Sequence, residues 1–279
     1  MLKALSGSGG ACLRLIDGAF DLFLRPFRAA NPLYGLTVIS VLTGLAALVV
    51  FRYDSNQDAL RRIKNRIQAH LLELRLFPDQ LGIVSRAHGR ILRWTAVYLA
   101  YNLKPFAVLL VPIVIVMVQL DLRYGRMPFG KDDTFILTAK LAQPSALGSD
   151  SLKLPKGLTL TAPPVNVPAL GEVSWRIRAE DYGEFLPAVV VAGQAFSKRV
   201  VVSKEISALQ AERGAGLLEW FINPVEEPLP RGGPVQSLEV NYAPRSIDLG
   251  FFATNWLVFF LVVSLVAGLI LKMVLGIEI

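Results

Sequence analysis

The sequence is poor in the residues that build covalent cross-links and metal sites. It has one cysteine, Cys12, so an intramolecular disulfide and a multi-cysteine metal site are both excluded. The two histidines, His70 and His88, lie in one basic segment without an evident third ligand, so we expect neither a metal site nor a cofactor. No grouping of nucleophile, base and orienting residue is visible. We therefore expect a protein that is not an enzyme and has no small-molecule substrate.

Charged residues interrupt the first apolar stretch of the chain, which removes the features of a secretory signal peptide. After residue 10 there is neither a continuous hydrophobic region nor a convincing Ala-x-Ala site. The charged residues follow at spacings of 3, 4, 4 and 3 and so share one helical face: Arg14, Asp17, Asp21, Arg25 and Arg28. Within residues 1–32 we therefore expect an amphipathic helix that lies in a membrane interface. The alternative is a helix packed on a soluble core.

Apolar residues are too abundant for an ordinary soluble protein. They make up 53% of the sequence against 18% charged residues, and the mean hydropathy is +0.48. A helix needs about 20 apolar residues to cross a hydrocarbon layer of roughly 30 Å. Three runs have the required length: Leu33 to Phe51, Trp94 to Leu120 and Leu249 to Leu275. We predict transmembrane helices at residues 33–53, 94–120 and 249–275.

The second run contains two prolines and one charge. Pro105 and Pro112 would each cost a soluble helix roughly 3 kcal/mol, whereas membrane helices tolerate proline when neighbouring helices cover the freed carbonyls. This span is therefore expected to pack against partners. Lys104 is the only charged residue from Trp94 to Leu120. It has two interpretations: a functional site, which is the default for an intramembrane charge, or a side chain that extends to the interface.

The first run carries small and hydroxyl residues on one helical face. Thr37, Ser40 and Gly44 share this face, and Thr43 lies beside them. Such residues commonly mark close contact between helices and less often line a hydrated groove. The sequence allows both interpretations, with helix contact favoured.

Residues 54–93 combine a helical repeat with a strong positive charge. Between residues 52 and 93 there are nine basic and four acidic residues, which places the segment in the cytoplasm by the positive-inside rule. Apolar residues recur every four positions from Ala59 to Leu71, so we expect a helical hairpin that turns at residues 77–79. Its first helix bears a basic surface that is able to contact acidic lipid, a ribosome or simply water: Arg61, Arg62, Lys64 and Arg66.

Residues 121–248 form short, partly alternating stretches separated by Pro, Gly, Asp and Ser. Runs such as EVSWRIRA predict an antiparallel β-sandwich of the immunoglobulin-like kind, with Val173, Trp175 and Ile177 on the core face of one strand. A helix is expected from Ser207 to Trp220. The segment has 14 basic and 15 acidic residues, so we expect it outside the cytoplasm. The N-terminus then lies outside and the C-terminus in the cytoplasm.

Together these pieces resemble the shared core of the YidC/Oxa-type membrane protein insertases. The resemblance spans residues 11–129. It is carried by NPLYGL after the amphipathic helix, by RRIKNRIQAHLLEL in the basic hairpin, and by Asn102, Pro105 and Pro112 in the second span. It implies an α-helical membrane protein of the bacterial plasma (inner) membrane. Such a protein assists the insertion or assembly of other membrane proteins, and makes or breaks no bond.

Two features depart from the family. Bacterial insertases have five core spans, whereas three are predicted here, as in archaeal and endoplasmic-reticulum relatives that lack a large domain after the second span. The groove arginine of the first span has no counterpart, because no residue from Leu33 to Phe51 is charged. The resemblance therefore implies that the polarity of a groove comes from other residues: Lys104, Asn102 and Tyr101, helped by Thr37, Ser40 and Thr43.

Two functions are compatible with the sequence. In the first, a partly hydrophilic groove receives the polar flank of a nascent or partner membrane protein, because hydration lowers the cost of carrying polar groups into the lipid bilayer. In the second, the chain is a membrane-anchored structural or interaction protein whose β-sandwich binds an extracytoplasmic partner. The proline pattern and the basic hairpin favour the first function. The missing groove charge and the large β-sandwich favour the second.

Overall fold

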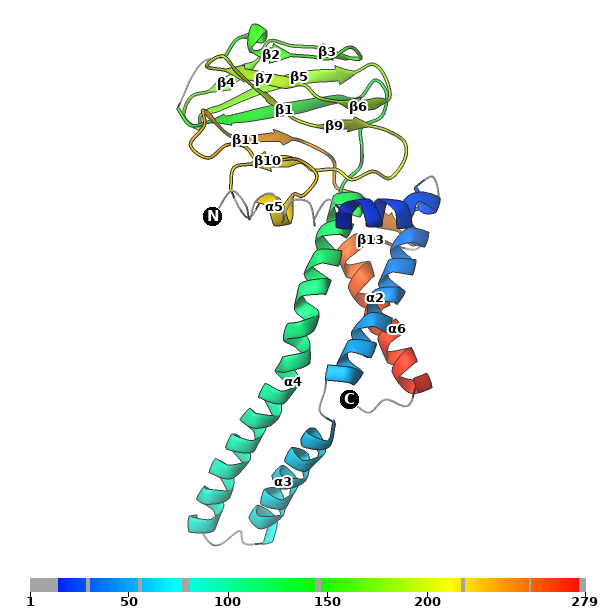
Figure 1. Ribbon diagram of the computed structural model, residues 1–279, viewed down its shortest axis with the longest axis vertical. Coiled ribbons are helices and arrows are strands. Elements are labelled where there is room, and N and C mark those ends of the chain that lie inside the picture. The colour runs from blue at the N-terminus through cyan, green and yellow to red at the C-terminus, as the bar shows by residue number, and fades with distance from the viewer. Residues whose placement is uncertain are drawn as a thin grey trace. The chain divides into compact units, whose positions relative to one another are not determined.

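The computed structural model describes residues 15–28, 31–54, 57–76, 81–143, 147–216, 219–250 and 252–275 (Figure 1). The chain divides into two compact units. One comprises Met1–Leu36 and Val116–Phe259, and the other comprises Thr37–Ile115 and Phe260–Ile279. The first unit contains all the β-strands of the described residues, and the second is helical.

Three helices among the described residues are long and apolar enough to cross a membrane. This confirms the prediction that three apolar segments form helices of that length. They lie in α2 (Pro32–Asp54), α4 (Leu81–Tyr124) and α6 (Trp256–Leu275). Two of these helices are preceded by an asparagine, whose side chain accepts a hydrogen bond from an otherwise unpaired backbone N–H of the first turn. The Asn31 side chain accepts from Leu33 N at 3.0 Å, and that of Asn255 accepts from Leu257 N at 2.9 Å.

Helix α4 is one continuous element of 44 residues. It joins the second arm of the predicted hairpin to the second apolar run, so no structural break separates residues 93 and 94. The helix also continues through Pro105 and Pro112.

Helix α3 (Gln57–Leu76) packs on the first part of α4 (Figure 1). The Arg66 guanidinium lies 4.4 Å from the ring centre of Trp94, and Arg90 pairs with Glu73 at 3.8 Å. Ile63 of α3 and Ala87 of α4 are buried. Residues 57–76 and 81–94 therefore form a helical hairpin. Of the predicted apolar repeat, Ile63 is buried and Leu71 is 50% exposed.

Helices α2 and α6 approach each other closely at Gly44. A Cβ at this position would collide with the backbone oxygen of Ser264, and Ala267 is the next neighbour. Ser40, one turn earlier on the same face of α2, is fully buried. At this level the small-residue face of the first span is a helix contact, the more favoured of its two interpretations.

The β domain begins at Thr134 and consists of antiparallel sheets. The main sheet has six strands, in the order β10 (Glu212–Gly214), β11 (Val235–Val240), β1 (Thr134–Leu141), β5 (Glu172–Ala179) and β3 (Leu158–Leu160), with β4 (Val165–Val167) also paired to β5. A second sheet contains β2 (Leu152–Lys153), β7 (Ala188–Val191) and β8 (Gln194–Ser197), and β6 (Gly183–Phe185) pairs with β9 (Val200–Val202). Two short helices, η2 (Ser149–Ser151) and α5 (Glu219–Ile222), lie in the connections.

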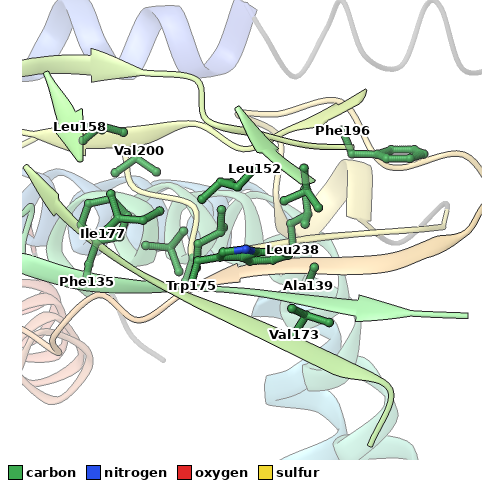
Figure 2. Packing of buried hydrophobic residues seen from close by; sticks show 14 of the residues in the cluster. Phe135, Ala139, Leu152, Leu158, Val173, Trp175, Ile177, Phe196, Val200 and Leu238 are labelled. Atoms are coloured by element: carbon green, nitrogen blue, oxygen red, sulfur yellow. The ribbon is translucent and has the colours of Figure 1, made fainter. Parts of the chain in front are cut away.

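These sheets share one hydrophobic core. In β1, β5 and β7 alternate residues point inward. Val173, Trp175 and Ile177 of β5 are all buried, as their spacing predicts. Figure 2 shows them packed with Phe135 of β1 and with residues of the smaller sheets: Leu152, Phe196 and Val200. One end of the core is closed by Phe129, which stacks on Phe135 at 4.7 Å and on Tyr242 at 4.6 Å between ring centres.

Two further predictions differ from the structure. Helix α6 begins at Trp256 rather than at residue 249, because β13 (Ala253–Asn255) pairs with β12 (Ser246–Asp248). The helix predicted from Ser207 to Trp220 is wrong. Residues 206–211 are irregular, Glu212–Gly214 is strand β10, and of the residues described in this stretch only Glu219–Ile222 is helical. Pairing of β10 with β11 overrides the local helix propensity of this stretch.

Candidate functional site: a buried arginine cluster

Arg123 lies in the last turn of α4 and is the most deeply buried charge at the end of the helical segment. Its side chain is only 2% exposed. Gln119, one turn earlier, accepts from Nη1 with its side-chain oxygen at 2.6 Å and with its backbone oxygen at 3.2 Å. A guanidinium cannot lose its charge in a protein, so a buried arginine must be compensated by anions.

Two carboxylates from the N-terminal helix (residues 15–24) supply that compensation. Asp17 and Asp21 are one turn apart, so both face the same side of the helix. Nη2 of Arg123 donates to Asp17 and to Asp21, each at 2.7 Å, and Nε donates to Asp21 at 3.2 Å. Asp21 also pairs with Arg28 at 3.0 Å. We call Asp17, Asp21, Gln119 and Arg123 the Arg123 cluster.

The surroundings of the Arg123 cluster tie three parts of the first unit together. The helical turn η1 (Arg25–Phe27) follows the N-terminal helix, and Arg28 O accepts from Ile206 N at 3.1 Å. Leu122 O of α4 accepts from Leu209 N at 2.7 Å. The cluster therefore lies where the N-terminal helix, the end of α4 and the 206–209 segment of the β domain meet.

Glycine permits one further close contact beside the cluster. The Tyr124 hydroxyl packs on Gly35 in the first turn of α2, where a Cβ would collide with it. Tyr124 is fully buried, and its hydroxyl has no hydrogen-bond partner among the described residues. A side chain larger than hydrogen at position 35 would force the Tyr124 hydroxyl to move.

The groove candidates occupy different surroundings. Thr37, Ser40 and Thr43 lie on α2, where Ser40 is fully buried and the other two are partly buried. Tyr101 lies on α4 and is 46% exposed. Asn102 and Lys104 also lie on α4, but their side chains fall outside the described residues. The groove itself therefore stays a prediction.

The four basic residues predicted to form a surface on the hairpin lie on α3. Arg61, Arg62, Lys64 and Arg66 are all exposed, and Arg66 in addition stacks on Trp94. Four exposed cations within two helical turns give this face a strong positive potential.

A second buried charge lies within the β domain. Lys198, between β8 and β9, is 0% exposed, and its ammonium donates to the Glu226 carboxylate and to Gln210 O at 2.6 Å. Burial lowers the pKa of Lys198, and the nearby Glu226 carboxylate opposes that shift. This pair fastens the segment after α5 to the rest of the domain, since Glu226 also accepts from Arg199 N at 2.9 Å.

Next to it lies a more exposed ion pair. Arg199 donates from Nη2 and Nε to the two carboxylate oxygens of Glu184, at 2.5 and 3.0 Å. The hydrogen bond from Arg199 holds the pKa of Glu184 below its ordinary value. Tyr242, whose hydroxyl accepts from Val201 N at 3.1 Å, has its pKa raised to about 12 by burial.

Sequence reasoning missed Arg123 and Lys198. The signal for Arg123 was available, because two aspartates one turn apart in an apolar helix call for a cation, and Arg123 stands at the end of an apolar run. Nothing in the local sequence distinguishes Lys198 from an ordinary surface lysine. Within the described residues, no group of three or more His, Cys, Asp or Glu is placed to hold a metal ion.

Comparison of the chain with protein-family models, with curated proteins and with solved structures finds no match. Any function must therefore be argued from the residues of the chain itself.

Proposed function

We propose that this chain is a YidC/Oxa-type insertase of a bacterial inner membrane. In this proposal α2, α4 and α6 cross the bilayer and the α3–α4 hairpin lies in the cytoplasm. The β domain, an immunoglobulin-like sandwich, lies outside the cytoplasm. The N-terminus is then outside and the C-terminus inside.

The observation that supports the proposal best is the continuity of α4. One 44-residue helix carries the hairpin arm at one end, the proline-bearing apolar run with Lys104 in the middle, and Arg123 at the other end. A nascent chain that first contacts the basic hairpin would then reach the apolar part of α4, where a few polar residues lie close together along the helix. Tyr101, Asn102 and Lys104 are the residues that would receive its polar flank, with Thr37 and Thr43 as helpers.

No bond is made in this mechanism. A polar group that enters hydrocarbon without a partner costs several kcal/mol. Lys104 and its polar neighbours, with the water that they retain, would lower this cost while the apolar part of the segment moves into lipid. The proposed partners are nascent membrane proteins and the bilayer, with a ribosome or acidic lipid at Arg61, Arg62, Lys64 and Arg66.

Photo-crosslinking during membrane-protein synthesis tests the proposal. A crosslinking amino acid is placed at Thr43, Tyr101 or Lys104, and the buried Ser40 is avoided because a bulky group there would disturb packing. Leu265, an exposed residue of α6, is the control for contact with lipid alone. Crosslinks from residues 101 and 104 to nascent chains, without such crosslinks from 265, support a groove. Crosslinks to lipid only would contradict the insertase proposal.

A second candidate is a membrane-anchored interaction protein. The β domain favours it, because this domain has its own extended core and is fastened to α4 through Leu209 and Leu122. In that case the crosslinking experiment would capture the same partner whichever membrane protein is being synthesised. That partner would also be captured by crosslinking from the β domain.

A further inference from the structure

Residues 206–211 form a segment that is irregular in structure and nevertheless buried. Its buried members are Ile206, Ala208, Leu209, Gln210 and Ala211. Connecting segments usually run over the surface, because a buried loop has backbone N–H and C=O groups that water cannot reach. This segment must therefore find its hydrogen-bond partners in the elements around it.

Two backbone N–H groups of the segment donate to the helical part of the first unit. Ile206 N donates to Arg28 O at 3.1 Å, directly after η1, and Leu209 N donates to Leu122 O at 2.7 Å. Leu122 lies in the last turn of α4, where a carbonyl has no partner within the helix. The segment therefore satisfies backbone groups of two other elements while they satisfy its own.

Two backbone carbonyls of the segment accept from cations of the β domain. Arg199 Nη1 donates to Ala208 O at 3.0 Å, and the buried Lys198 ammonium donates to Gln210 O at 2.6 Å. Hydrogen bonds from charged donors are roughly twice as strong as neutral ones. The helices thus hold the segment through its donors, and the β domain holds it through its acceptors.

These contacts close a ring with the Arg123 cluster. Arg123 binds Asp21 at 2.7 Å, and Asp21 binds Arg28 at 3.0 Å. From Arg28 O the ring passes to Ile206, and the segment returns to α4 at Leu122, next to Arg123. A link that opened alone would leave a buried charge or a buried backbone group without a partner, which costs free energy. The links are therefore expected to open together rather than one at a time.

We propose that the N-terminal helix with η1, the last turn of α4 and residues 206–211 open and close as one cooperative unit. Release of the N-terminal helix then loosens residues 206–211, and displacement of residues 206–211 releases the helix, because such a coupling acts equally in both directions. The segment can be reached from outside, since Ser203 and Ser207 line a surface hollow of about 280 Å³ beside Tyr182. This inference rests neither on the insertase activity nor on a bilayer.

Hydrogen exchange of the full-length protein in mild detergent, read by mass spectrometry, tests the inference. Peptides that cover residues 15–28, 116–125 and 203–211 report the three parts of the unit. Arg199→Gln weakens the unit from the β domain, and Arg123→Gln weakens it from α4. Arg213→Gln is the matched control, because Arg213 also donates to two backbone carbonyls of the β domain, Ser197 O and Glu227 O, but not to residues 206–211.

We expect Arg199→Gln and Arg123→Gln each to speed exchange by about tenfold or more in all three peptides, since each removes hydrogen bonds from a charged donor. Arg213→Gln should leave the three peptides unchanged. Faster exchange confined to residues 203–211 in Arg199→Gln, and to the two helical peptides in Arg123→Gln, would show independent parts and overturn the inference. So would an equal effect of Arg213→Gln, because the β domain would then loosen as a whole.

Peptides from β1 and β5 show whether the β domain stays folded in each variant. If Arg199→Gln unfolds the domain, exchange in these two strands also becomes faster, and Arg123→Gln then decides alone, because Arg123 lies in α4 and outside the core of the domain. In Arg123→Gln, faster exchange at residues 206–211 with unchanged β1 and β5 supports the cooperative unit. Unchanged exchange at residues 206–211 overturns it.

Discussion

The guanidinium of Arg123 donates to the carboxylate of Asp17 at 2.7 Å, across 106 residues of sequence. The contact joins the N-terminal helix to the end of α4. Since Arg123 is 2% exposed and the Asp17 side chain 22% exposed, the two partners do not lose the same amount of hydration on folding. This asymmetry decides which substitution is the more harmful.

Removal of the carboxylates is predicted to destabilise the protein more than removal of the arginine. Asp17→Asn with Asp21→Asn leaves a buried cation without counterions, which costs about 3 to 5 kcal/mol. Arg123→Gln leaves two carboxylates that can partly rehydrate, so we expect a loss of about 1 to 3 kcal/mol. Chemical unfolding of the full-length protein in mild detergent measures both values.

The variant with all three substitutions is the control for this prediction. It should be more stable than the double aspartate variant, because the unpaired charge is gone. A triple variant whose loss equals the sum of the separate losses would show that these residues are not coupled.

The sequence predicts the elements of this fold better than their pairings. Hydrophobic periodicity is a local property, and it revealed the apolar helices, the hairpin and the buried residues Val173, Trp175 and Ile177. The Arg123 cluster depends on residues more than 100 positions apart, which no local pattern reports. Hydropathy likewise could not separate β13 from α6, because residues 249–255, which precede the helix, carry no charge.

Gly44 is predicted to be required for the contact between α2 and α6. In Gly44→Ala, the new Cβ would meet the backbone oxygen of Ser264, which cannot rotate away, so the helices must separate. Overpacking of this kind costs about 1 to 3 kcal/mol. Gly268→Ala is the matched control, since its Cβ would lie an ordinary 3.8 Å from Gly44 O. Resistance to unfolding in SDS should fall for Gly44→Ala only, and equal losses in both variants would contradict the prediction.

Glu184→Gln is predicted to lower the stability of the protein slightly at neutral pH, and this loss is expected to disappear at acid pH. The Arg199 hydrogen bond keeps the pKa of Glu184 lower in the folded than in the unfolded state, so its contribution is present above the unfolded value of 4.5 and is lost as the pH falls through the folded pKa. The Glu184 side chain is 62% exposed, so we expect less than about 1 kcal/mol at pH 7.

Unfolding curves between pH 3 and pH 7 should therefore show wild type and Glu184→Gln converging as the pH falls. Glu205→Gln, at an exposed turn, controls for the loss of one surface carboxylate. A difference that persists unchanged at the acid end would exclude the Arg199 pair as its cause.

Glu226→Gln is predicted to destabilise the β domain most strongly at neutral pH. Burial makes the pKa of Lys198 lower in the folded than in the unfolded state, so folding is penalised while the lysine is charged, and stability rises as the pH climbs toward 10.5. Removing Glu226 lowers that pKa further. We expect a loss of about 3 to 5 kcal/mol at pH 7 that shrinks toward pH 10.

The exposed neighbour Glu227 supplies the control. Glu227→Gln should cost less than about 1 kcal/mol, as for a surface carboxylate. Denaturant unfolding of both variants at pH 7 and pH 10 checks the prediction. A loss of stability in Glu226→Gln that is the same at both pH values would refute it.

Lys104→Leu is predicted to abolish most insertion activity while the protein still folds. Lys104 is the one charge within the second apolar run, so its replacement by leucine removes the group on which hydration of the proposed groove depends, yet leucine is favourable in a lipid-facing helix. Insertion of a reporter membrane protein into proteoliposomes measures the activity. Lys272→Leu, which removes a lysine near the end of α6, is the matched control and should leave insertion unchanged. Normal insertion by Lys104→Leu would show that the lysine only extends to the interface, and that the groove, if the chain forms one, does not depend on it.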